Sequence, residues 1–364
     1  MIDRRLFVHF DWFLFIIVAL LATIGVVNIY SATIGTDSQI YQKQIYWLMI
    51  GISFMVLFLL MDYSNLEVIA YIIYGVIILL LIVVIAMGRS SLGAQRWLNL
   101  GFISIQPSEF SKISLIIALS KYFSNKWIPP QGLNVKELII PVILFVIPFF
   151  LITKQPDLGT AMILGLIFFS MVLLIRIRTK ILIVTSGLLV SIVPLTWYYL
   201  KDYQKARLMS FLKPAQDPLG TGYHLIQSKI AIGSGGIFGE GFLNGTQGRL
   251  LFLPEHHTDF IFSILAEEWG FIGSFCVTGL FLLLIIMGLN TAKHAKDRFG
   301  SLLAFGVTSM FFWHVVINIG MVTGMLPVVG APLPFFSYGG SFLVTVIFGV
   351  GILLNVNMRR FILR

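Results

Sequence analysis

The segment Leu253–Phe262 carries the densest group of side chains that could perform chemistry. Glu255, His257 and Asp259 fall within five residues of one another. Carboxylates beside imidazoles are typical of either a metal site or an acid–base centre. The spacing matches no common zinc pattern, so no metal bound by protein groups alone is predicted. A carboxylate in a low-dielectric environment can have its pKa raised, which suits a general base. Thr258 or Asp259 could also cap the helix that follows, and a cap and a base are not exclusive.

Further ionisable residues lie within or beside long apolar segments, where charges are costly and therefore become functional candidates. Glu109 and Lys112 are three residues apart, so one helix face carries both and an ion pair can form. Asp157 opens an apolar segment directly after Pro156. The other candidates are Arg96, Arg207, Lys229, Glu267 and Glu268.

A glycine-dense stretch, 232–241, precedes the Glu255–Asp259 cluster. It resembles a phosphate-cradling loop, although the Gly-Lys-Ser/Thr ending of a nucleotide P-loop is missing. Glycine also permits tight turns and close approach of the backbone to a neighbour. A re-entrant turn is therefore the alternative interpretation.

Composition indicates which elements must position these groups. The chain has 364 residues, 58% hydrophobic and 11% charged, whereas soluble domains have about 25% charged residues. This excludes a soluble enzyme, a disordered protein and a nucleic-acid-binding protein. Cys276 is the one cysteine, which excludes a disulfide scaffold, and its apolar neighbours predict a buried thiol. The sequence thus predicts a polytopic membrane protein.

Apolar stretches predict ten transmembrane helices, since one bilayer crossing needs about 20 residues. The expected fold is an all-α integral membrane protein, a single domain over 1–364 with one large extracytoplasmic loop, 201–261. The predicted spans lie near residues 12–33, 44–61, 67–88, 107–122, 137–153, 157–175, 181–200, 262–290, 302–325 and 337–358.

An even number of spans places both chain ends on one side of the membrane. With cytoplasmic ends, fourteen lysines and arginines fall in inner segments and four in short outer loops. The positive-inside rule therefore predicts cytoplasmic termini. The candidate residues then gather on the extracytoplasmic side, whereas a transporter places its polar site near the midplane. A surface site for a lipid-linked substrate is favoured.

Long motifs in a fixed order cover nearly the whole chain. They read GAQRWLNLG and QPSEFSK (93–112), QPDLGT (155–160), DPLGTGYHLIQSK (217–229) with the glycine stretch, LPEHHTDFIF (253–262), and NIGM, LPVVG and SYGGS (318–341). In these motifs the chain resembles the SEDS family (shape, elongation, division and sporulation), most closely its rod-shape branch. Two positions depart from that branch: Glu240, where a basic residue is usual, and Trp269, where leucine is usual.

The resemblance implies a peptidoglycan glycosyltransferase that polymerises lipid II on the outer face of the bacterial cytoplasmic (inner) membrane during cell elongation. Asp259 matches the family's essential aspartate, which implies a general base for the acceptor hydroxyl. A polyprenyl diphosphate is the implied leaving group, stabilised by cations. The residues expected to bind the substrate or shape its site are Arg96, Glu109, Lys112, Asp157, Arg207, Lys229, Glu255 and His257.

The same resemblance implies a complex with a class B penicillin-binding protein, a transpeptidase, within membrane lipids. A divalent cation, Mg²⁺ or Mn²⁺, could bridge the diphosphate and a carboxylate, and no organic cofactor is implied. Two alternatives stay open. One is a flippase for lipid-linked cell-wall precursor, which would need a hydrophilic path through the bundle. The other is a non-catalytic scaffold for the penicillin-binding protein.

Overall fold

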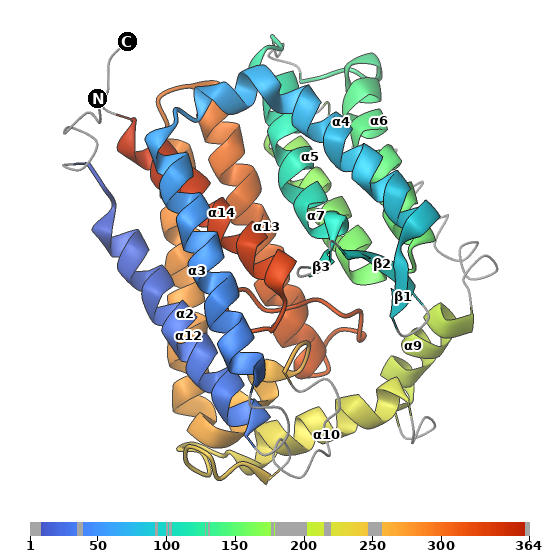
Figure 1. Ribbon diagram of the computed structural model, residues 1–364, viewed down its shortest axis with the longest axis vertical. Coiled ribbons are helices and arrows are strands. Elements are labelled where there is room, and N and C mark those ends of the chain that lie inside the picture. Colours follow the sequence, from blue (N-terminus) through green and yellow to red (C-terminus); the bar gives the residue numbers. More distant parts are fainter. Residues whose placement is uncertain are drawn as a thin grey trace.

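The computed structural model describes residues 9–34, 39–91, 94–99, 101, 104–127, 129, 132–175, 178, 202–214, 220–246 and 257–360. Within them, long helices form an elongated bundle, and two further helices lie across one of its ends (Figure 1). The described helix α2 begins and α14 ends at the opposite end, where the Asn357 side chain donates to Asp11 Oδ2 over 2.5 Å.

The helices of the bundle lie within a few residues of the predicted spans. They are α2 (Trp12–Thr33), α3 (Gln39–Leu60), α4 (Ser64–Met87), α5 (Pro107–Ser124), α6 (Val135–Lys154), α7 (Leu158–Leu174), α12 (Ile261–Lys293), α13 (Arg298–Val322) and α14 (Gly340–Met358). Among the described helices, seven are long and apolar enough to cross a membrane. The other two are α5, which carries three charged residues, and α7, which has 17 residues. The predicted span 181–200 lies outside the described residues, so ten spans stay a prediction.

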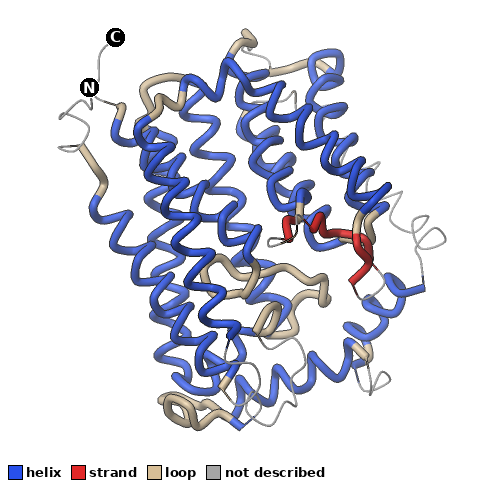
Figure 2. The backbone as a smooth tube through the Cα atoms, viewed as in Figure 1, coloured by secondary structure: helices blue, strands red, loops and turns tan. Residues whose placement is uncertain are grey.

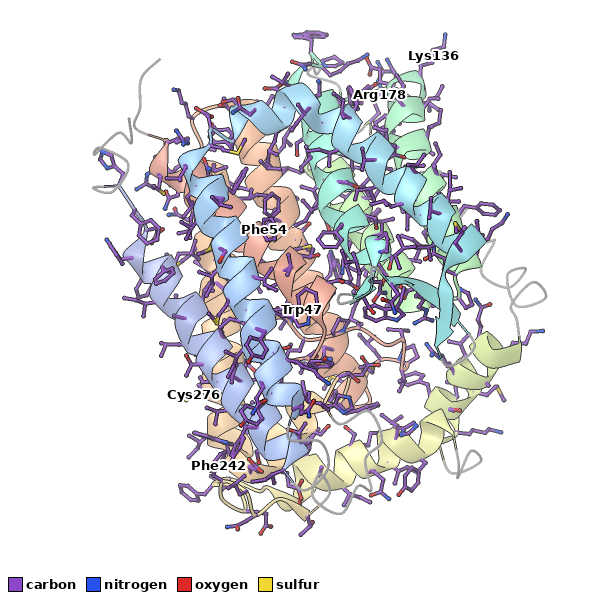
Figure 3. The ribbon with its side chains drawn as sticks, viewed as in Figure 1. Trp47, Phe54, Lys136, Arg178, Phe242 and Cys276 are labelled. Carbon is purple, nitrogen blue, oxygen red and sulfur yellow. The ribbon has the colours of Figure 1, made fainter. Side chains whose placement is uncertain are left out.

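The outside of the bundle is apolar, as a lipid environment requires. Phe54 on α3 and Phe275 on α12 are 54% and 68% exposed. Cys276 is exposed on the same stretch of α12 (Figure 3), so the predicted buried thiol is wrong. The reason is that this side of α12 faces away from the helices that pack against it. By contrast, 94% of the apolar stretch of α14 is buried, which places α14 at the centre.

The expected all-α fold is wrong between α4 and α5, where three short strands form an antiparallel sheet (Figure 2). β1 (Arg89–Ser91) pairs with β2 (Ala94–Asn99), and β2 pairs with β3 (Ser104–Ile105). Backbone groups beyond the end of α4 need hydrogen-bond partners, and strand pairing supplies them. Strands of two to six residues carry too little alternation to be recognised in the sequence.

The predicted loop 201–261 contains regular structure in its described part. α9 (Asp202–Leu212) and α10 (Thr221–Ser234) lie across the end of the bundle that carries the strands (Figure 1). The Ser228 hydroxyl of α10 donates to Val322 O over 2.6 Å and lies 2.8 Å from the Ser263 hydroxyl. α10 is therefore attached to both α12 and α13, and we call this end of the bundle the α10 end.

α12 is interrupted near its start at Gly270. Its φ of 63° and ψ of −159° are accessible in practice to glycine alone. The interruption exposes the backbone carbonyls of Glu267 and Glu268, which accept from the N–H groups of Glu240 (3.0 Å) and Gly241 (3.1 Å).

The glycine stretch also accepts hydrogen bonds from α12. The N–H groups of Phe271 and Ile272 donate to Gly236 O (2.9 Å) and Ile237 O (3.2 Å). The N–H groups of Glu240 and Gly241, which a phosphate cradle would need, donate to α12 as well, so they are used inside the protein. The close approach of two backbones, and not phosphate binding, explains the glycine content of this stretch.

Replacing Gly270 by alanine is expected to destabilise the protein. A Cβ there would lie 2.7 Å from Ile237 O, and a non-glycine residue at this backbone conformation costs about 1–3 kcal/mol. Thermal unfolding of the purified protein measures the effect. Gly279→Ala on the same helix is the control, because its Cβ meets no atom within 4 Å and alanine favours a helix. Equal unfolding temperatures for the two variants would contradict the proposed role of Gly270.

Candidate functional site

Asp259 lies in the turn that leads into α12. Phe260 occupies the N-cap position of this helix and makes no side-chain hydrogen bond there, so the prediction that Thr258 or Asp259 is the N-cap residue is wrong. The Asn318 amide of α13 donates both to Asp259 O (2.9 Å) and to Ala331 O (2.7 Å). One buried side chain therefore ties the backbone of Asp259 to the connection between α13 and α14.

That connection, residues 323–339, is called here the α13–α14 loop; it enters the bundle between the helices (Figure 2). Two more hydrogen bonds join it to the turn before α12. The Ser337 hydroxyl donates to Thr258 O (2.6 Å) and accepts from Leu333 N–H (2.7 Å). The Tyr338 N–H donates to His257 O (2.9 Å). The loop thus binds the carbonyls of His257 and Thr258 directly, and Asn318 of α13 bridges the carbonyl of Asp259 to it.

The Asp259 carboxylate lies at Gly330 of the same loop. Gly330 has a φ of 78°, and a Cβ there would lie 3.3 Å from Asp259 Oδ2. Gly159, in the first turn of α7, packs on the same stretch, since its Cβ would lie 2.8 Å from Val329 O. Arg207 of α9 donates to Val329 O over 3.2 Å. The start of α7, the side chain of Arg207 and the Asp259 carboxylate therefore meet at residues 329–330.

Asp157 caps α7 and organises the residues around it. Its Oδ1 accepts from Thr160 N–H (3.4 Å), and its Oδ2 accepts from the Gln106 amide (3.0 Å) and the Ser108 hydroxyl (3.1 Å). Arg96 Nη1 lies 4.0 Å from Asp157 Oδ1. Because 4% of Asp157 is exposed, it shapes the site from within the protein.

Arg96 is also bound to the turn between α6 and α7. Its Nε donates to Gln155 O over 3.2 Å, and its Nη2 donates to Pro156 O. These bonds use donors that could otherwise hold a phosphate. Arg96 therefore attaches β2, the strand on which it lies, to the turn between α6 and α7.

Glu109 and Lys112 form the predicted ion pair, with Lys112 Nζ 2.7 Å from Glu109 Oε2. Lys112 Nζ also lies 3.0 Å from His314 Nε2, and His314 Nδ1 lies 2.9 Å from Pro332 O. Lys112 and His314 are fully buried, so Lys112 cannot reach a substrate in this conformation. His314 was not among the predicted site residues. Its signal was present, since an ionisable side chain inside a membrane helix is itself a candidate.

The remaining predicted residues are dispersed. Lys229 is exposed on α10, with its side chain against Gly324 at the start of the loop, away from Gly330. His257 is half-buried, and its ring centroid lies 6.2 Å from that of Tyr338. Glu255 lies outside the described residues. Glu267 accepts from the Thr246 N–H (2.6 Å) and hydroxyl (3.1 Å), which is a structural contact.

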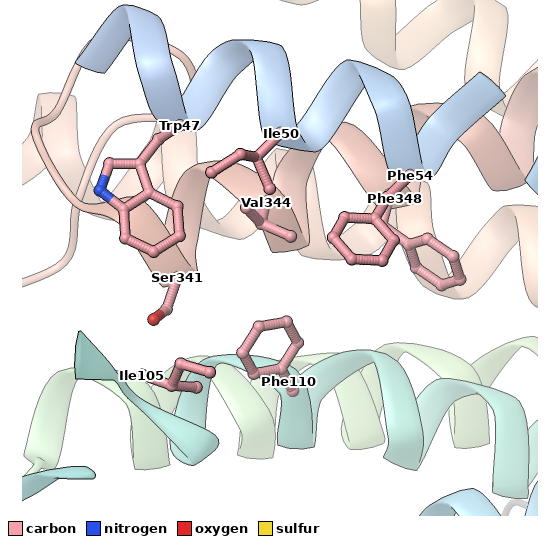
Figure 4. A pocket seen from close by; sticks show the side chains of 8 residues that line it. All are labelled: Trp47, Ile50, Phe54, Ile105, Phe110, Ser341, Val344 and Phe348. Atoms are coloured by element: carbon pink, nitrogen blue, oxygen red, sulfur yellow. The ribbon is translucent and has the colours of Figure 1, made fainter. Parts of the chain in front are cut away.

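An apolar groove of about 400 Å³ opens between α3, α5 and α14 (Figure 4). Its one polar lining side chain is Ser341, whose hydroxyl accepts from Gln106 N–H over 3.0 Å. Since the Gln106 side chain binds Asp157, the polar end of the groove adjoins the start of α7. The groove is lined by Trp47, Ile50, Phe54, Ile105, Phe110, Ser341, Val344 and Phe348.

Within the described part of the chain, no three histidine, cysteine, aspartate or glutamate side chains are grouped to hold a metal ion. Mg²⁺ is commonly held by one or two carboxylates together with substrate phosphates and water. Asp259 offers one such carboxylate. The donor set therefore fits a cation that arrives with a diphosphate.

The model of one protein family, described as "Cell cycle protein" (FtsW, RodA, SpoVE), matches residues 11–361. The chain is 41% identical over 354 residues to the peptidoglycan glycosyltransferase MrdB of Escherichia coli K12, covering 97% of this chain and 95% of MrdB. It is 34% identical to the peptidoglycan glycosyltransferase RodA of Treponema pallidum, covering 96% and 98%.

The fold is similar to that of a chain in a solved peptidoglycan synthase complex, whose description concerns the coordination of polymerization and crosslinking. The TM-score is 0.84 at 32% identity, and the match covers 97% of this chain and 98% of that one. Sequence and fold agree over nearly the full length, and the chain belongs to the FtsW/RodA/SpoVE (SEDS) family of multi-pass membrane proteins.

Proposed function

We propose that this chain polymerises lipid II into glycan strands on the outer face of the bacterial cytoplasmic membrane during cell elongation. The observation that carries the proposal is the Asp259 carboxylate, which lies at Gly330 of the α13–α14 loop, where α7, α9 and α12 converge, while Asn318 holds the Asp259 backbone carbonyl. The near full-length similarity to rod-shape peptidoglycan glycosyltransferases supports the activity.

In the proposed reaction, Asp259 is the general base. The C4 hydroxyl of the acceptor lipid II attacks the anomeric carbon of the donor, and its proton passes to the Asp259 carboxylate. The bond between that carbon and the polyprenyl diphosphate breaks, and the diphosphate leaves with the electron pair. Attack opposite the leaving group converts the α-linked donor into a β-linked glycan. One base suffices, because a diphosphate leaves as a stable anion.

Among the four predicted cations, Arg207 is the one we assign to the diphosphate. It reaches Val329, next to the Gly330 position that faces Asp259 Oδ2. Lys112 is buried against Glu109, and Arg96 is bound to the carbonyls of the α6–α7 turn. A divalent cation, Mg²⁺ or Mn²⁺, held by Asp259 and the diphosphate would add positive charge where the leaving group develops its charge.

The apolar groove is the proposed site for one polyprenyl tail. Its lining is apolar apart from Ser341, and that polar end leads through Gln106 to Asp157 and the start of α7. A lipid-linked substrate has the matching chemistry, with a long apolar tail and an anionic head group. The tail would lie between α3, α5 and α14 while the head group faces the α10 end.

The proposed orientation places the α10 end outside and both termini in the cytoplasm. The opposite end of the bundle carries basic residues on its helix ends and connections, including Lys126, Lys296 and Arg359, as the positive-inside rule requires. The proposed partner is a class B penicillin-binding protein, which would crosslink the strands. The similarity to a chain of a peptidoglycan synthase complex supports that partnership.

Asp259→Asn is expected to abolish polymerisation, because the amide cannot accept the proton. The test uses purified lipid II and the chain in complex with its class B partner, with the transpeptidase blocked, and measures glycan strands on a gel. Loss of a general base lowers the rate by about 10²–10⁴-fold. Thermal unfolding of the same samples verifies that the variant is folded.

Three outcomes of this test are distinguishable. Strands from the native complex and none from the folded variant support the proposal. Equal strands from both would remove Asp259 from the mechanism. A native complex that is stable but makes no strands would favour the flippase or the scaffold alternative.

Arg207→Gln is expected to lower kcat by about 10²-fold, because one preorganised donor at the developing charge is lost. The matched control is Lys213→Gln, which removes an exposed positive charge just beyond the end of α9. The polymerisation rate at saturating lipid II measures both variants. Equal losses would show that general attraction of the anionic substrate, and not a specific contact of Arg207, is responsible.

A further inference from the structure

Two side chains on α13 hold consecutive carbonyls of the α13–α14 loop. Asn318 Nδ2 donates to Ala331 O (2.7 Å), and His314, one helical turn earlier, contacts Pro332 O through Nδ1 (2.9 Å). A carbonyl oxygen can only accept, so Nδ1 carries the proton. In the neutral ring Nε2 is then an acceptor.

The acceptor nitrogen of His314 faces a matching donor. Lys112 Nζ lies 3.0 Å from His314 Nε2 and 2.7 Å from Glu109 Oε2, and an ammonium group can only donate. The hydrogen bonds therefore have one consistent arrangement, in which Lys112 donates to Glu109 and to His314, and His314 donates to Pro332 O. The Phe342 ring holds both groups in place, 4.8 Å from the imidazole centroid and 5.1 Å from Lys112 Nζ.

This chain of hydrogen bonds ends beside the candidate base. Pro332 is two residues from Gly330, which faces Asp259 Oδ2, and its neighbour Ala331 shares the Asn318 amide with Asp259 O. A displacement of the Pro332 carbonyl would be transmitted to both. The imidazole uses both nitrogens, whereas a residue that merely filled space would need neither.

We propose that His314 is a positioning residue that holds the α13–α14 loop, and through it Asp259, in the geometry of the proton transfer. Lys112 and Glu109 act behind it by fixing the orientation of the ring, and none of the three contacts substrate. This inference rests on the proposed glycosyltransferase activity.

The test separates the two hydrogen bonds of the ring. His314→Phe removes both and keeps an aromatic ring, His314→Gln retains an acceptor near Lys112, and His314→Asn retains a donor near Pro332 O. Misplacement of reacting groups by about 1 Å can cost 10²-fold in rate. We therefore expect the Phe and Gln variants to lose about 10²-fold in kcat at nearly unchanged KM, and the Asn variant to recover most of the loss.

Asn355→Leu is the control for stability. Asn355 is buried in α14 near the opposite end of the bundle and donates to Phe58 O and Met61 O, both over 2.8 Å. Its replacement removes these two hydrogen bonds and the one that Asn355 Oδ1 accepts from Arg359 Nε (2.8 Å), so it should lower the unfolding temperature without lowering the kcat of the folded fraction. If Asn355→Leu and His314→Phe lose kcat equally, or if His314→Phe polymerises like the native chain, the positioning role is overturned.

Amide hydrogen exchange gives a readout that does not depend on activity. The N–H groups of Leu333 and Tyr338 are bonded to Ser337 Oγ and His257 O. They should exchange faster in His314→Phe than in the native chain, and at the native rate in His314→Asn. If no variant alters their exchange, His314 does not hold the loop. A different outcome is that the native chain makes no glycan while His314→Phe still exchanges faster than the native chain. That outcome would refute the proposed function and keep the structural link between His314 and the loop.

Discussion

Irregular backbone inside a membrane protein must find its hydrogen-bond partners within the protein, because lipid offers none. The α13–α14 loop enters the bundle and meets this requirement with side chains of Asn318, His314 and Ser337. Two of them, Asn318 and Ser337, also bind carbonyls of residues 257–259. One set of hydrogen bonds therefore both pairs the backbone groups of the loop and positions the candidate base. A change in one is expected to change the other.

The buried side chains of Glu109 and Lys112 must likewise find their partners within the protein. A lysine with no exposed surface is costly to desolvate, and Lys112 is compensated by one carboxylate and one imidazole nitrogen. Glu109 lies one turn from Lys112 on α5, and His314 lies on α13. The hydrogen bonds of the Lys112 ammonium group therefore connect α5 to α13. Apolar packing alone would allow the two helices to slide relative to each other.

Local patterns in the sequence predicted the local features well. Apolar length located the described helices of the bundle, the i,i+3 spacing of Glu109 and Lys112 predicted their pairing, and Pro156 marked the turn before α7. Contacts between distant residues carry no such pattern. Lys112 contacts a histidine 202 positions later in the sequence. The glycine stretch packs on an interruption of α12, and in the sequence only the presence of a glycine at position 270 is consistent with that interruption. The short strands and the exposed Cys276 depend on neighbours in space in the same way.

The position of α14 has a consequence for biogenesis. α14 is the last of the described helices, yet it packs along α3, where Gly51 accommodates Ile347 and Gly351 accommodates Met55. The second helix of the described bundle therefore has to stay in the bilayer without its main neighbour until α14 has been synthesised. Contacts of such long sequence separation form late and slowly. A nascent chain arrested before residue 340 would leave the face of α3 that carries Gly51 and Met55 exposed to lipid.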